Sequence, residues 1–243
     1  MDLDIGIVIE YGPLILKGFR LTLIIVFFAI LLGIPLGILM AVGRMSSKPY
    51  FRGPAVAVLE IFRNTPFMIQ VFLLYYVLPF YGLRMPAEVV GVLALALYSS
   101  VYYAEIMRAG IAAVPRGQAE SARAIGMSHS QALRNVVFPQ MWPIVLPPVA
   151  NQTISLVKES SILATITVSE MTMSALIVQG ITFRPFEVFI MITILYWALN
   201  ETIAFSVRGL EKRLQKRHSR QATTKAQDAA MAESLEAVRR MTR

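Results

Sequence analysis

The sequence predicts an all-α membrane protein with about five membrane spans, and two observations support this prediction. Hydrophobic residues make up 56% of the chain and charged residues 16%, whereas soluble chains average roughly 45–50% and about 25%. The apolar residues also gather in long runs. Residues 21–42 carry no charge, and about 20 apolar residues suffice for a helix to cross a ~30 Å hydrocarbon core.

Five apolar runs are predicted to cross the membrane as helices. These spans cover about residues 19–43, 62–82, 88–110, 138–160 and 186–207. We therefore divide the chain into an extracytoplasmic segment 1–17, a membrane domain 18–208 and a basic tail 209–243. The tail is expected either to form a surface helix around residues 229–239 or to be disordered.

Two stretches interrupt this simple pattern. Residues 55–64 are amphipathic and lie just before Pro66. Because the residue before a proline resists helix, we expect their last turn to meet the membrane at an angle. Residues 161–181 are apolar but contain Ser, Thr and Glu170. Small hydroxyl side chains satisfy backbone groups where a helix breaks in the membrane, so this stretch predicts a short or re-entrant helix.

The distribution of basic residues predicts the orientation. The connections after the first and third spans are rich in Arg and Lys, and those after the second and fourth are not. The tail from Arg208 onward holds ten basic residues against four acids. Since cytoplasmic segments carry the excess of Lys and Arg, we expect the N-terminus outside and the C-terminus in the cytoplasm.

Composition also argues against several function classes. The chain has no cysteine and two histidines, His129 and His218, both in polar segments. The chain therefore has almost none of the side chains that a metal cluster or a catalytic triad needs, and we expect no metal site and no catalytic residue. The net charge of +8 is concentrated in a tail without interleaved aromatic residues, which argues against a nucleic-acid partner.

The polar segment between the third and fourth spans predicts a helical hairpin. Residues 118–125 favour a short helix that stops at Gly126, and Ser128 is suited to cap a second helix that starts near Gln131. The carboxylate of Glu120 then lies on an exposed face. Such a hairpin offers a docking site for a soluble partner, although an ordinary interfacial connector fits the same physical pattern.

The spacing in this segment resembles the EAA loop of ATP-binding-cassette import permeases. That pattern is E-A-A, three residues, G, nine residues and then I-x-L-P. The residues of this chain at the E-A-A, glycine and proline positions are Glu120, Ser121, Ala122, Gly126 and Pro139. Ser121 stands where the pattern has alanine, and Val136 and Phe138 are conservative replacements.

Three further stretches resemble the polar amino-acid branch of the same family. The R-[GN]-T-P-x-x-x-Q signature is matched by Arg63, Asn64, Thr65, Pro66 and Gln70. The A-E-x-x-R-[GA]-G stretch is matched by Ala104, Glu105, Arg108, Ala109 and Gly110. A K-N-[TS]-S-L element is matched at residues 158–162, where Glu159 replaces the usual amide. The resemblance covers about residues 18–208.

The resemblance implies a type I importer membrane domain in a bacterial inner membrane. It implies a second permease chain, identical or a sister, and a cytoplasmic ATPase dimer that docks on the EAA helix. It also implies a periplasmic or lipid-tethered amino-acid-binding protein. This chain lacks a G-x-x-x-x-G-K-[ST] phosphate loop, so it is not expected to be an enzyme or to bind a cofactor, and ATP with Mg²⁺ belongs to the ATPase.

Polar residues within the spans are the candidates for the translocation path, because charged groups in a membrane usually face a pathway or the bundle interior. The candidates are Thr65, Gln70, Lys158, Glu159 and Ser160. Packing between helices explains the same residues. The substrate stays open among acidic, basic and amide amino acids and opines. If the chain were a secondary transporter, the EAA spacing would be a coincidence. If it were a membrane enzyme, it would have to work with few histidines, no cysteine and no paired acids.

Overall fold

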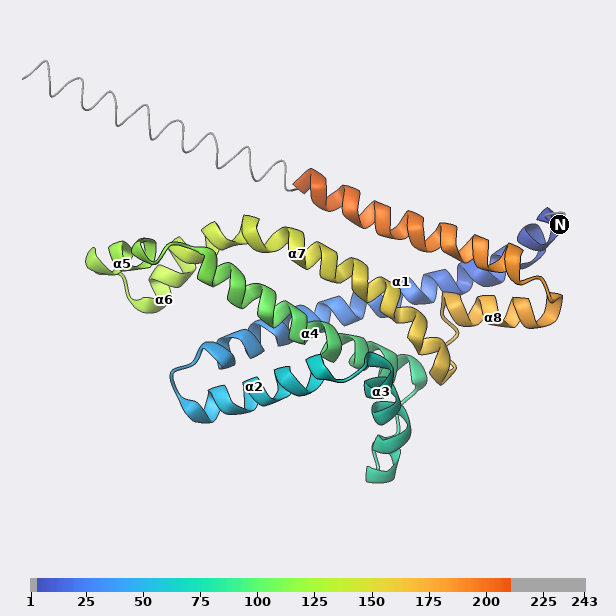
Figure 1. The fold of residues 1–243 in the computed structure, drawn as a ribbon, viewed down its shortest axis with the longest axis horizontal. Helices are drawn as coiled ribbons and strands as arrows, with labels where there is room; N and C mark the ends of the chain where they lie inside the picture. Colours follow the sequence, from blue (N-terminus) through green and yellow to red (C-terminus); the bar gives the residue numbers. More distant parts are fainter. Residues whose placement is uncertain (1–3, 211–243) are drawn as a thin grey trace, which may run out of the picture.

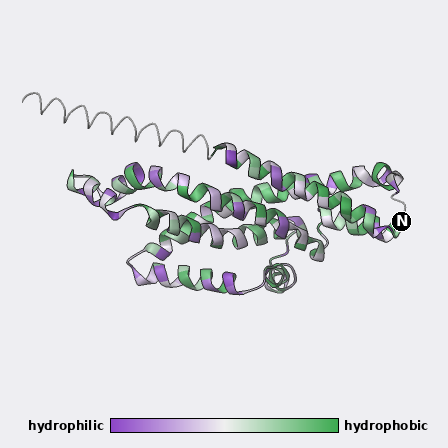
Figure 2. Ribbon diagram, turned by 45° about the horizontal axis from the view of Figure 1, so that its top comes forward, coloured by the Kyte–Doolittle hydropathy of each residue, from purple (hydrophilic) through white to green (hydrophobic). Residues whose placement is uncertain are grey.

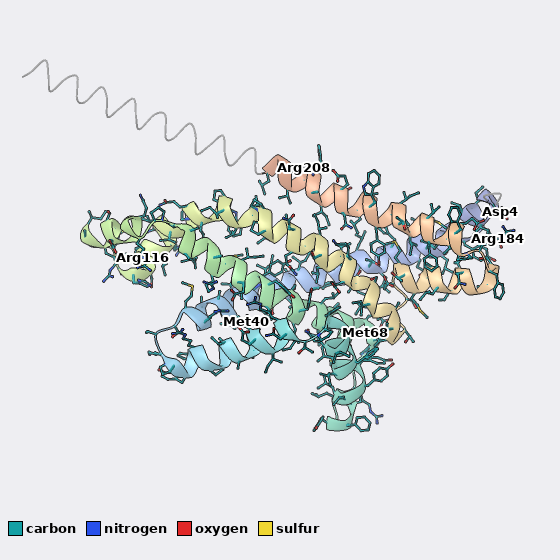
Figure 3. All side chains as sticks on the ribbon, viewed as in Figure 1. Asp4, Met40, Met68, Arg116, Arg184 and Arg208 are labelled. Atoms are coloured by element: carbon teal, nitrogen blue, oxygen red, sulfur yellow. The ribbon has the colours of Figure 1, made fainter. Side chains whose placement is uncertain are left out.

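A computed structural model describes residues 4–210 of the chain, and its regular elements over that range are all helices. Several long helices lie side by side, and hydrophobic residues extend over much of their length (Figures 1 and 2). Arg116 lies near one end of this bundle, and Asp4 and Arg184 lie near the other (Figure 3). The predicted tail and its possible helix at 229–239 fall outside the described residues.

The first helix, α1 (Ile5–Met45), is longer than the predicted span 19–43. It begins at Ile5 because the Asp4 side chain accepts a hydrogen bond from the Gly6 N–H group at 2.9 Å, as an N-cap does. Ile7 and Ile15 are buried against helix α8 (Met171–Thr182). The described part of segment 1–17 is therefore helical, since tertiary packing extends α1 beyond the uncharged run.

The predicted second span is divided in two. Helix α2 (Pro49–Asn64) is followed by an arm, residues 67–81, and the two meet at an angle of 111°. The helix does break before Pro66, whereas the expected angle to the membrane stays a prediction. The arm turns away from the long helices in Figure 1. It consists of α3 (Phe67–Phe72), the π-helix η1 (Leu73–Val77) and the 3₁₀-helix η2 (Leu78–Tyr81).

The middle of the chain follows the prediction closely. The predicted third span corresponds to α4 (Ala87–Ala113), and the predicted fourth corresponds to α7 (Phe138–Glu159). Between them, the predicted hairpin is present at the Arg116 end of the bundle. It consists of α5 (Arg116–Ala124) and α6 (His129–Ala132), and the π-helix η3 (Leu133–Val137) connects it to α7.

The stretch predicted as a short or re-entrant helix is also confirmed. It contains the 3₁₀-helix η4 (Ser160–Ile166) and α8, and the chain bends by 52° between them. The last described helix, Pro185–Leu210, follows. Within the described residues, three helices are long and apolar enough to cross a membrane, or up to five spans if each bent pair counts as one. The predicted five spans agree with that upper count.

Helices α1 and α4 pack closely because two glycines on α1 allow it. A Cβ atom on Gly37 would lie 2.7 Å from the Cβ atom of Tyr103 and 2.8 Å from the carbonyl oxygen of Ser100. A Cβ on Gly33 would lie 2.4 Å from the hydroxyl oxygen of Ser99. The two glycines form a G-x-x-x-G pattern, which favours close contact between helices in membranes.

A buried carboxylate connects three helices at the opposite end from the hairpin. Glu170 is fully buried. It accepts hydrogen bonds from the N–H group of Met173 at 2.8 Å and from the hydroxyl of Tyr196 at 3.2 Å. The Thr22 hydroxyl accepts the N–H group of Met171 at 3.1 Å. These bonds fix the start of α8 against α1 and the last described helix.

We predict opposite effects for two Gly→Ala substitutions in helices. Gly37→Ala in α1 forces a methyl group into the α4 backbone and is expected to cost about 1–3 kcal/mol. Gly180→Ala in α8, where a Cβ meets no atom within 4 Å, is expected to stabilise the helix by about 0.5–1 kcal/mol. Thermal melting of the purified chain in detergent measures both. Equal melting temperatures for the two variants would contradict this packing.

Candidate functional site

The α5–α6 hairpin turns through a glycine that a side chain would strain. Gly126 has φ +91°, a left-handed conformation that favours glycine. Its N–H group donates a hydrogen bond to the carbonyl of Arg123 at 3.0 Å. The N–H group of Met127 donates to the carbonyl of Ala122 at 3.1 Å. This is a Schellman ending of a helix. The predicted stop at Gly126 is therefore present.

The second helix of the hairpin starts from a complete capping box. The Ser128 hydroxyl accepts a hydrogen bond from the Gln131 N–H group at 3.3 Å. In return, the Gln131 side chain accepts one from the Ser128 N–H group at 2.8 Å. The predicted cap is confirmed, although α6 begins at His129 and not near Gln131. Each end of the turn is thus held by its own hydrogen bonds, so the hairpin has a defined shape.

Of the residues that match the EAA pattern, some lie on the surface of the hairpin and others in its interior. Glu120 and Ser121 are exposed, while Ala122 is buried. Pro139 lies in the first turn of α7. Next to it, the Gln140 amide donates to the Gln118 side chain at 3.2 Å and so connects α7 to α5.

An open hollow of about 580 Å³ lies on the hairpin. It is lined by Glu120, Arg123, Ala124, Gly126, Met127, Ser128 and Gln131. Ile125, beside the turn, is 77% exposed. A carboxylate, a guanidinium and an apolar side chain are therefore presented together on a small rigid surface, as a docking site requires.

Glu105, Arg108 and Gly110 lie on the hairpin side of α4. The Glu105 carboxylate pairs with Arg44 of α1 and with Arg108 at 3.1 Å. A Cβ on Gly110 would lie 2.1 Å from a methyl carbon of Val145, so this glycine allows α4 to approach α7. Sequence reasoning missed Arg44 as the partner of Glu105, because 61 residues separate them.

The R-N-T-P-x-x-x-Q residues lie at the break between α2 and the arm. Asn64 donates to the carbonyl of Glu60 at 2.8 Å, and Thr65 donates to that of Ile61 at 2.7 Å. Gln70 donates to the carbonyl of Phe62 at 2.8 Å and to that of Thr65 at 2.9 Å. The signature therefore satisfies the carbonyl groups that the end of a helix leaves free. Arg63 is exposed.

The five residues predicted for the translocation path differ in their burial and in their hydrogen bonds. Gln70 and Ser160 are buried, and both donate to nearby carbonyl groups, so neither lies on an open surface. Thr65 is half-buried and bonds to its own helix. Lys158 is exposed and Glu159 is half-buried. These two remain available to a solute or to another chain.

Lys158 belongs to a polar stripe on α7 that sequence reasoning missed. Asn151, Ser155 and Lys158 are spaced by four and three residues, which places them on one face of a helix. Asn151 and Lys158 are exposed in the described chain, and Ser155 is half-buried. The helical spacing of Asn151 and Ser155 before Lys158 is the feature of the sequence that could have revealed this stripe.

Comparison with known proteins identifies the family. The profile of the binding-protein-dependent transport system inner membrane component family matches residues 33–216. The chain belongs to this family. The match includes the hairpin, the Glu105 ion pairs, the Pro66 break and the α7 stripe.

Relatives and solved structures agree with that assignment. A probable amino-acid ABC transporter permease, YckA of Bacillus subtilis, is 35% identical over 84% of this chain and 91% of its own length. The nopaline transport permease NocM of Agrobacterium fabrum is 36% identical over 80% and 85%. An amino-acid ABC transporter crystallised with histidines has a TM-score of 0.82 at 38% identity, over 88% of this chain and 100% of that chain. A methionine transporter, MetNI, at 21% identity and TM-score 0.64, shares the fold.

We predict that the Glu105 ion pairs stabilise this inner membrane component more than its exposed pair does. Glu105→Gln weakens two pairs of partly buried groups and is expected to cost about 1–3 kcal/mol. Glu201→Gln, the matched control, weakens a pair with Arg208 in which both side chains are about half exposed, and is expected to cost less than about 1 kcal/mol. Melting temperatures in detergent compare the two. A larger loss in Glu201→Gln would refute the ranking.

Proposed function

We propose that this chain is the membrane-spanning permease of an ATP-driven amino-acid importer. The observation that carries the proposal is the likeness to the amino-acid transporter crystallised with histidines, which extends over 88% of this chain at 38% identity. Family membership and the permease names of the relatives support it. The chain forms the translocation path and is not itself an enzyme.

The α5–α6 hairpin is the surface that docks on the ATPase. It projects at one end of the bundle (Figure 1), and its hollow presents Glu120 and Arg123 beside an exposed Ile125. The ATPase dimer binds ATP with Mg²⁺. This assignment places the hairpin and the C-terminal tail in the cytoplasm and the start of α1 outside, as the positions of the basic residues also favour.

Two further partners complete the importer. A second permease chain, identical or a sister, faces this one across the path, and a periplasmic or lipid-tethered binding protein delivers the amino acid. ATP binding closes the ATPase dimer and moves the hairpins, so that the path opens alternately to the two sides of the bacterial inner membrane. The permease responds as a set of packed rigid helices with two arrangements.

The stripe Asn151, Ser155 and Lys158, with the neighbouring Glu159, faces the path. An ammonium group or an amide exposed to lipid is costly, so a polar stripe at membrane depth turns towards water or another chain. Lys158 is suited to a carboxylate, and Glu159 to an ammonium group. Every α-amino acid carries both groups, which fits this pair of side chains.

The names of the relatives do not agree on one solute. GlnM of Bacillus subtilis is named for glutamine at 35% identity, ArtQ of the same organism for arginine at 31%, and NocM for nopaline, an opine. Binding measurements on the cognate binding protein with acidic, basic and amide amino acids and opines will select among these solutes.

Substitutions in the hairpin test the docking proposal. Glu120→Lys reverses the charge at the hollow, and Gly126→Asp places a side chain on a left-handed residue. Both are expected to abolish substrate-stimulated ATP hydrolysis in reconstituted transporter while the chain still inserts into the membrane. Gly209→Asp, at an exposed position with no atom within 4 Å, serves as the control. Uptake at the unsubstituted level in both hairpin variants would sink the proposal.

Lys158 provides a separate test of the path. Lys158→Gln removes a charge-assisted hydrogen bond to substrate and is expected to raise the KM for uptake about tenfold, or about 1.4 kcal/mol. Basal ATP hydrolysis is expected to stay unchanged. The control is Lys48→Gln, at an exposed residue between α1 and α2. An unchanged KM in Lys158→Gln would remove this residue from the path.

A further inference from the structure

The break between α2 and the arm leaves one backbone carbonyl without its usual hydrogen-bond donor. In an α-helix, each carbonyl accepts from the N–H group four residues later. The carbonyl of Phe62 would pair with residue 66, but that residue is Pro66 and has no N–H group. In an apolar bundle, a carbonyl without a donor carries a cost of several kcal/mol, so this break requires a donor from elsewhere.

Gln70 supplies that donor from the other side of the break. Its Nε2 atom lies 2.8 Å from the carbonyl oxygen of Phe62 and 2.9 Å from that of Thr65. Phe62 belongs to α2, Thr65 lies between the helices, and Gln70 is in α3. One amide group therefore joins the end of α2 to the beginning of the arm.

The surroundings of Gln70 argue for this role and against contact with a solute. The residue is 6% exposed. Its Oε1 atom is buried and accepts no hydrogen bond from the described residues. The amide is therefore oriented by its two donated bonds, and in this conformation a solute has no access to the oxygen.

We propose that Gln70 is a positioning residue that sets the angle between α2 and the arm. Pro66 and the Thr65 that precedes it break the helix, but a break alone leaves the direction of the following segment free. The two bonds from Gln70 restrict that direction to the observed bend of 111°. The inference goes beyond the proposed function and does not depend on ATPase docking or on the identity of the substrate.

Distance measurements on the full-length chain test this role. The chain has no native cysteine, so Ala57→Cys in α2 and Phe80→Cys near the end of the arm place two spin labels at exposed positions. An excess of unlabelled chain isolates the distances within one chain. The arm of residues 67–81 is about 20 Å long at ~1.5 Å per residue, so a swing of about 15° moves its end by about 5 Å.

Two substitutions in this labelled background separate the possible roles. Gln70→Met fills the space but donates no hydrogen bond. Gln70→Glu has the same shape, but even when protonated it donates one hydrogen bond, whereas the amide donates two. Both are expected to shift or broaden the distance distribution by about 5 Å or more. Gln179→Met, in α8, is the matched control, because the described residues give its side chain no hydrogen bond, and it is expected to leave the distribution unchanged.

Two results would overturn the proposal. The first is an unchanged distribution in both Gln70 variants; an altered KM for uptake in the same variants would then indicate contact with substrate. If neither Gln70→Met nor Gln70→Glu yields folded protein, Gln70→Asn keeps the amide but is one methylene shorter, and is expected to broaden the distribution. An unchanged distribution in Gln70→Asn is the second.

Discussion

The need to pair every backbone carbonyl and N–H group away from water governs this structure. A continuous helix satisfies most of that need by itself, and α1, with 41 residues, is the longest among the described residues, although Pro13 and Pro35 within it donate no N–H group. Where the helices stop or bend, the missing partners come either from the backbone, as at the end of α5, or from side chains. The residues that carry the family signature at 63–70 do this for α2, and Glu170 does it for α8.

Close packing of the helices is the second requirement, and small residues provide it. Gly33 and Gly37 bring α1 against α4, and Gly110 brings α4 against α7. Because α4 contacts both neighbours through such positions, it forms the centre of the bundle. Ion pairs from Glu105 join α4 to α1 at the hairpin side. Lipid gives no hydrophobic drive between helices, so these contacts are the main source of association.

Local signals made the hairpin predictable from sequence. Gly126 and Ser128 act through the backbone of their own turn, and their chemistry is visible in a few adjacent residues. The order of the spans followed from apolar runs in the same way. The placement of Gln70 and Ser160 was not predictable, because a polar residue at membrane depth suits either a path or a broken helix. Only the three-dimensional contacts show that both bond to nearby carbonyls. The Glu105–Arg44 pair and the early start of α1 depend on distant segments, which no local pattern reports.

The π-helix η3 (Leu133–Val137) has a consequence for how the hairpin and the path are related. A π-turn holds one residue more than an α-turn, and each residue of a helix advances the side chains by about 100°. The extra residue therefore sets the rotational phase of α7 with respect to α6, the second helix of the hairpin. Asn151 and Lys158 owe their direction to that phase, although they lie several turns away. The length of η3, as much as the identity of its side chains, decides the direction in which the polar stripe of α7 points.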